Sequence, residues 1–102
     1  MAMRISVTRS GGFTGIPIQF SFDEQDLDPQ ELQELLTAIQ ATRFFTLPTH
    51  LSAVSGSADT FTYSITIETN DQHHTLFSPE SALPEPLGAV LHKLVRKARR
   101  RS

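Results

Sequence analysis

Four short segments in which apolar and polar residues alternate constrain the fold of this chain more than any other feature. A period of two places successive side chains on opposite faces of a strand, so each segment is expected to be a strand with one buried face. The segments are residues 3–9, 16–22, 60–69 and 72–78. The side chains predicted to face inward are Met3, Ile5, Val7, Ile16, Ile18, Phe20, Phe22, Phe61, Tyr63, Ile65, Ile67 and Leu76.

The first two segments are predicted to pair as a hairpin. They are separated by residues 10–15, which contain three glycines and suit a turn longer than the minimum. Pro17 lies near the start of the second segment. Because proline has no N–H to donate to a ladder, this strand is expected to lie at a sheet edge.

The last two segments are predicted to form a second hairpin around a two-residue turn, Asn70-Asp71. This turn fixes the register, since residues that are equidistant from it must lie opposite each other. The predicted pairs are Ile67 with His74, Ile65 with Leu76, and Glu68 with His73.

A helix is predicted to begin after Asp28, which suits the N-cap. Pro29 stands at the first helical position, and Glu31 follows the cap by three residues, which is a capping-box arrangement. The helix is expected to end near Thr42. Its apolar face is formed by Leu32, Leu35, Leu36 and Ile39.

A second helix is predicted after Pro84 and Pro86, which suit a first turn. Its apolar stripe is Leu87, Val90, Leu91, Leu94, Val95 and Ala98. The order ββαββα predicts an α+β fold with a four-stranded antiparallel sheet and two helices on one face. We expect one domain over residues 1–102, with a frayed basic tail at 99–102.

The connection between the two halves is predicted in two parts. Phe44, Phe45 and Leu47 form an apolar clamp, and residues 48–57 are small and aperiodic. We interpret the second part as a mobile loop.

Composition restricts the function classes. Apolar residues make up 38% of the 102 residues, which suffices for a packed core, and the absence of cysteine excludes disulfides and thiol catalysis. No long apolar run indicates a secretory signal or a membrane span, so a cytoplasmic location without membrane association is expected. Met1 and Ala2 precede the first strand pattern, are expected to be residues added for expression, and have no role.

The charge is unevenly distributed. An acidic stretch covers residues 23–34, whereas six basic residues fall within residues 93–101. This basic end allows a nucleic-acid-binding regulator as the alternative function, because Lys and Arg neutralise phosphates. We favour the reading that these cations complement the helix dipole, since no nucleic-acid-binding motif is present.

No residue set predicts catalysis or metal binding. The histidines at 50, 73, 74 and 92 lack metal-site spacing, and the adjacent pair points to opposite faces of its strand. The serines have no nucleophile-elbow context, and the Gly11-Gly12 pair lacks the lysine and helix of a phosphate loop. We therefore expect no enzyme activity, no cofactor and no bound metal.

The loop Ser10-Gly11-Gly12-Phe13-Thr14-Gly15 is the most distinctive local feature. In one interpretation the glycines form a bulged turn and Phe13 folds back to cap the core. In the other, Phe13 projects from the loop towards a partner. Turn chemistry alone leaves both interpretations open.

The segments MRISVTRSGGFTGI (3–16) and ADTFTYSITIE (58–68), together with the closing helix from Pro84, resemble the emfourin family of peptidase inhibitors. The resemblance implies reversible occlusion of the active-site cleft of a thermolysin-type zinc metallopeptidase, such as protealysin. Any zinc would then belong to the target. Residues 47–57 carry no matching pattern, so whether the loop 48–57 joins the contact stays open.

The resemblance also implies the residues of contact. Thermolysin-type enzymes favour a large apolar side chain after the scissile bond, so Phe13 is the first candidate for that pocket. Gly11, Gly12 and Gly15 would shape the loop, and Ser10 and Thr14 could hydrogen-bond at its rim. The free protein is expected to be a monomer.

Overall fold

The computed structural model describes residues 2–11, 16–53 and 61–101 of the chain, without the side chain of Arg101. The order ββαββα and the α+β class are as predicted. The main elements are β1 (Met3–Gly11), β2 (Ile18–Asp23), α1 (Pro29–Thr42), β3 (Phe61–Thr69), β4 (His73–Pro79) and α2 (Leu87–Arg101). Short 3₁₀ turns follow β2, α1 and β4, at Glu24–Asp26, Phe44–Thr46 and Glu80–Ala82.

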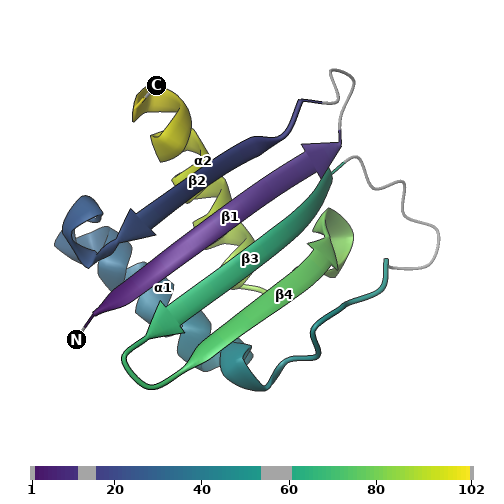
Figure 1. Cartoon of the computed structure of the whole chain (residues 1–102), viewed down its shortest axis with the longest axis horizontal. Helices are drawn as coiled ribbons and strands as arrows, with labels where there is room; N and C mark the ends of the chain where they lie inside the picture. The colour runs from purple at the N-terminus through teal and green to yellow at the C-terminus, as the bar shows by residue number, and fades with distance from the viewer. Residues whose placement is uncertain (1, 12–15, 54–60, 102) are drawn as a thin grey trace.

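The four strands form one antiparallel sheet in the order β2-β1-β3-β4 (Figure 1). The second hairpin has the predicted register, with Ile65 opposite Leu76 and Glu68 opposite His73. Its turn is closed by the Thr69 N–H, which donates to the Gln72 carbonyl at 2.8 Å. Strand β2 lies at the edge of the sheet, as Pro17 predicted. The pairing of β1 with β3, which joins the two hairpins, was not predicted.

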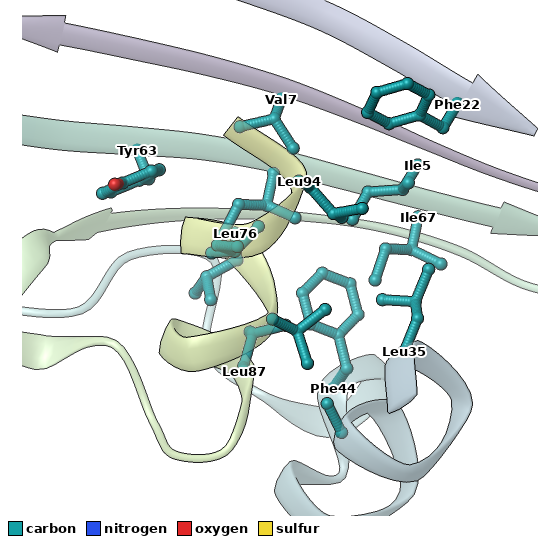
Figure 2. Packing of buried hydrophobic residues seen from close by; sticks show 14 of the residues in the cluster. Ile5, Val7, Phe22, Leu35, Phe44, Tyr63, Ile67, Leu76, Leu87 and Leu94 are labelled. Carbon is teal, nitrogen blue, oxygen red and sulfur yellow. The ribbon is translucent and has the colours of Figure 1, made fainter. Parts of the chain in front are cut away.

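Both helices cover the same face of the sheet (Figure 1). The core between these two layers combines the inward faces of the strands with one stripe of each helix, and Figure 2 shows how their side chains converge. Among its fully buried members are Ile5, Phe22, Leu35, Phe44, Tyr63, Ile65, Ile67, Leu76, Leu87 and Leu91. On the opposite face of the sheet, here called the outer face, the described residues form no helix.

Helix α1 begins with the predicted cap. The Asp28 carboxylate accepts the Glu31 N–H at 2.8 Å, and the Glu31 carboxylate accepts the Asp28 N–H at 2.9 Å. These reciprocal bonds satisfy donors that a helix start leaves without intrahelical partners. The helix ends at Arg43, whose left-handed backbone (φ 53°) turns the chain into the apolar clamp.

Helix α2 begins at Leu87, one residue after Pro86, and continues to Arg101. Residues 99–101 are assigned to this helix, and the fraying expected at 99–102 stays a prediction. Two of the basic residues of α2 are held by α1: Lys93 Nζ lies 2.7 Å from the Glu34 carboxylate, and Lys97 Nζ lies 2.8 Å from that of Glu31. Part of the basic end thus has a structural role.

Two expectations need correction. Strand β2 starts at Ile18, and Ile16 is 71% exposed rather than directed into the core. The start of the loop 48–57 is also more ordered than expected, because it lies along β4. There the Phe77 N–H donates to the Thr49 carbonyl at 2.7 Å, and the Leu51 N–H donates to the Phe77 carbonyl at 2.9 Å.

Candidate protein-binding site

The candidate site lies where β1 extends beyond the start of β2. The last pair between these strands is Arg9 with Ile18, whereas β3 continues to pair with Ser10 and Gly11. The two residues predicted as the start of the loop thus belong to a strand. Their pairing with β3 holds the first two residues of the predicted loop in the sheet.

Gly11 has a conformational reason to be glycine. Its φ is 104°, a value that residues with a Cβ rarely adopt. Gly11 lies directly opposite Phe61 of β3. The last described residue of β1 thus has a backbone conformation that only glycine adopts readily.

The central part of the predicted site, Gly12, Phe13, Thr14 and Gly15, lies outside the described residues. The choice between a projecting and an infolded Phe13 is thus untested, and the contact role of residues 10–15 stays a prediction. Residues 54–60, which include the second half of the predicted loop 48–57, also lie outside the described residues. Ser10 and Gly11 are the two members of the predicted site that the structure places.

Ile16 is a feature of this end of the sheet that the sequence analysis missed. Its 71% exposure leaves a large apolar side chain beside the predicted loop. A signal was present, because Pro17 has no N–H to donate to a ladder, and proline within a sheet is confined to edge strands, bulges or the first residue of a strand. The period-two pattern concealed this signal by continuing one step too far.

An aromatic and cationic cluster supports the site from the inner face. The Arg9 guanidinium lies 4.2 Å from the centre of the Phe61 ring, a cation–π contact that joins β1 to β3 beside Gly11. Tyr63 is buried next to this pair. Burial raises the pKa of the Tyr63 hydroxyl, and the Arg9 guanidinium acts in the opposite direction.

The described residues contain no group of three or more His, Asp or Glu side chains that could hold a metal. Three of the histidines make separate contacts: His50 stacks on Phe77, His74 packs edge-on against Phe44, and His92 lies 3.2 Å from the Glu80 carboxylate. The described residues at the site offer the Ser10 hydroxyl, the Gly11 backbone and the apolar surface of Ile16.

Such an arrangement defines a small α+β protein whose candidate site is suited to contact with another surface. Across the parts of the chain with an assigned structure, no helix has the length and apolar character needed to cross a membrane. The chain belongs to the Emfourin family, whose model matches residues 7–95. The matched range includes all of the predicted site and both helices up to Val95.

Neither the curated proteins nor the solved structures include a match to this chain. The family assignment therefore rests on the family model. It supports an inhibitor role and a peptidase as partner, in agreement with the resemblance seen in the sequence.

Proposed function

We propose that this protein is a reversible inhibitor of thermolysin-type, protealysin-like zinc metallopeptidases and acts without catalysis of its own. The observation that carries the proposal is the match of the Emfourin family model to residues 7–95, which covers the first hairpin from Val7 onward and all of the second. The pairing of Ser10 and Gly11 of β1 with β3, at the base of the predicted loop, supports it further.

In the proposed mechanism, the loop of residues 10–15 enters the active-site cleft of the peptidase. Phe13 occupies the pocket that receives the large apolar side chain of a substrate. Burial of an aromatic side chain in such a pocket supplies a large part of the binding free energy. The zinc belongs to the peptidase, and the inhibitor contributes no metal ligand to the mechanism.

Restraint at the base of the loop supports the proposal that the loop resists cleavage. A protease needs its substrate in an extended, well-aligned conformation, and a loop that is held at its base cannot relax freely into that conformation. The pairing of Gly11 with Phe61 and the Arg9–Phe61 contact restrain that base. Restraint before binding also lowers the entropic cost of association.

The alternative of nucleic-acid binding through α2 is less well supported. Lys93 and Lys97 already pair with carboxylates of α1, and Lys97 is about three-quarters buried, with 23% of its side chain exposed. A phosphate would have to compete with these two carboxylates. The pairs favour a structural role for this part of the basic end.

The test is a titration of purified thermolysin with the full-length protein, followed by hydrolysis of a peptide substrate. We expect stoichiometric loss of activity that returns on dilution. Added zinc at a concentration that does not itself inhibit thermolysin should leave the inhibition unchanged, which separates occlusion from metal removal. Full activity at a large excess of the protein over thermolysin and over a protealysin-like enzyme would contradict the proposal.

A further inference from the structure

The outer face of the sheet changes in character from one end to the other. At the end near the β3–β4 turn, a row of cross-strand neighbours is rich in charge: Arg4, Asp23, Glu68 and His73. The next row contains only hydroxyl residues, with Ser6 bonded to Ser21 at 2.9 Å and Thr66 bonded to Thr75 at 2.8 Å. The two rows nearest the candidate site carry no formal charge. They consist of Thr8, Gln19, Ser64 and Phe77, followed by Ser10, Thr62 and Pro79.

An aromatic pair stands at the edge of this uncharged area. His50 and Phe77 are stacked with ring centres 4.9 Å apart and planes inclined by 16°. Phe77 is 39% exposed, and with Ile16 it forms the set of exposed large apolar side chains in the described part of the chain. Phe77 lies opposite Ser64, one row from the pair Ser10–Thr62, and Ile16 lies two residues before the start of β2, next to the predicted loop.

The pair is fixed in place before any partner binds. The N–H and the carbonyl of Phe77 bond to Thr49 and Leu51, so the residue between them, His50, is held beside the Phe77 ring. Aromatic side chains that need little ordering are effective anchors, because their burial is not offset by a large loss of conformational entropy. The backbone bonds of residues 49–51 to Phe77 are enough to cover this part of the β4 edge. They do not account for the exposed Phe77 ring on the outer face.

The distance from the predicted loop is short compared with an ordinary interface. Ser10 and Phe77 are separated by two strand spacings of about 4.8 Å and by two residues of about 3.4 Å along the strands. A stable complex buries roughly 800 Å² on each partner, which a six-residue loop cannot provide alone. A partner seated over Ser10 must therefore cover neighbouring surface as well, and the Phe77 ring is within its reach.

The chemistry of this surface favours a protein as partner. Interface cores are depleted in charge, as these two rows are, and they favour aromatic residues such as Phe77. Nucleic acid would require cations to neutralise its phosphates, and these rows provide none.

We propose that the stacked pair His50–Phe77 is a second anchor in the complex with the metallopeptidase and packs against apolar surface beside its active-site cleft. This inference rests on the proposed function. The interface of the inhibitor would then have two parts. The loop of residues 10–15 enters the cleft, and the His50–Phe77 pair on the outer face contacts the peptidase beside the cleft.

The experiment compares wild type with Phe77→Ser in inhibition of thermolysin and in direct binding measured by calorimetry. We expect Phe77→Ser to weaken both at least tenfold, with a small shift of the unfolding midpoint, since the ring lies on the outer face and its backbone bonds persist. His50→Ala, which removes the stack without altering β4, should weaken binding in the same direction. The matched control is His73→Ser, an exposed position on the same face of the same strand, which should bind as wild type does.

Three results would overturn the inference. If wild type inhibits thermolysin and both Phe77→Ser and His50→Ala inhibit equally well, the aromatic patch is not part of the interface, while the proposed function stands. If wild type forms a dimer that Phe77→Ser dissociates without loss of inhibition, the patch serves self-association instead. If wild type neither binds nor inhibits, the proposed function fails first and the inference fails with it.

Discussion

Individual residues at the base of the loop differ in the kind of constraint they impose. Gly11 is constrained by its backbone, since its φ of 104° disfavours other residues. Arg9 and Phe61 are constrained by each other, through the contact between guanidinium and ring. Ile16 has the opposite character, because it exposes apolar surface that the fold does not use for its core.

Phe13→Ala is expected to weaken inhibition at least tenfold while the unfolding midpoint stays nearly unchanged. The reason is that an interface anchor costs about 2 kcal/mol or more on truncation, whereas a side chain outside the core contributes little to folding. Inhibition constants and thermal unfolding should be measured side by side. Loss of potency together with several kcal/mol of stability would place Phe13 in the core instead.

Tyr63 is expected to ionise at higher pH than a free tyrosine. Burial raises the pKa of its hydroxyl in the folded state. The neutral hydroxyl therefore contributes to the free energy of unfolding below the unfolded pKa of about 10, and this contribution is lost as the pH rises above that value. Because Tyr63 is the chain's one tyrosine, the ultraviolet absorbance of tyrosinate reports it directly.

The matching variant is Tyr63→Phe, which has no hydroxyl to ionise. Its free energy of unfolding should fall less than that of wild type as the pH rises above about 10. Titration of the native protein with the same midpoint as the denatured protein would contradict the assignment of Tyr63 to a buried environment.

At the scale of elements, α1 and α2 are joined by a carboxylate with two functions. The Glu31 carboxylate caps the start of α1 through the Asp28 N–H and also binds Lys97 of α2. Glu34 makes the neighbouring contact to Lys93, at an exposed position and without a capping role. The two acidic residues look alike in sequence but differ in what depends on them.

Glu31→Ala is therefore expected to destabilise the protein more than Glu34→Ala. Loss of a capping interaction costs about 0.5–2 kcal/mol, while an exposed ion pair contributes about 0–1 kcal/mol. Urea unfolding of both variants measures the difference, and added salt should reduce only the ion-pair part. Equal losses in the two variants would show that the cap contributes nothing measurable.

The elements also show what could be predicted from the sequence. The second hairpin was predicted in register because a two-residue turn fixes every pair after it. The β1–β3 pairing was not, since about fifty residues separate Gly11 from Phe61 and no local rule links them. The contact of His50 with β4 rests on two backbone bonds, which leave no periodic pattern in the sequence.

The site was predicted less completely than the fold, for a related reason. Glycine spacing indicated the loop, and the structure places Ser10 and Gly11 at its base. The exposure of Ile16 and Phe77 was not predicted. Alternation predicts which face of a strand a residue takes, but it does not tell where the pairing of two strands begins or whether a face of the sheet is covered.

For the whole molecule, removal of residues 99–102 is expected to leave inhibition unchanged. These residues follow the Lys93 and Lys97 contacts with α1, so the packing of α2 on the sheet should persist without them. Inhibition of thermolysin by the truncated and full-length proteins provides the measurement, with thermal unfolding as the control for folding. A large loss of potency in a folded truncated protein would show that the basic end contacts the peptidase.

The contact of residues 49–51 with β4 has a consequence for self-assembly. Strand addition can build a fibre only when each molecule offers two available edges, one for the molecule before it and one for the molecule after it. In this sheet Thr49 and Leu51 bond the N–H and the carbonyl of Phe77, which obstructs strand addition along β4 and makes β2 the more open of the two edges. Two molecules that met through β2 would close on each other as a pair, and growth would stop there. The contact of residues 49–51 with β4 thus works against polymerisation of the sheet through this edge.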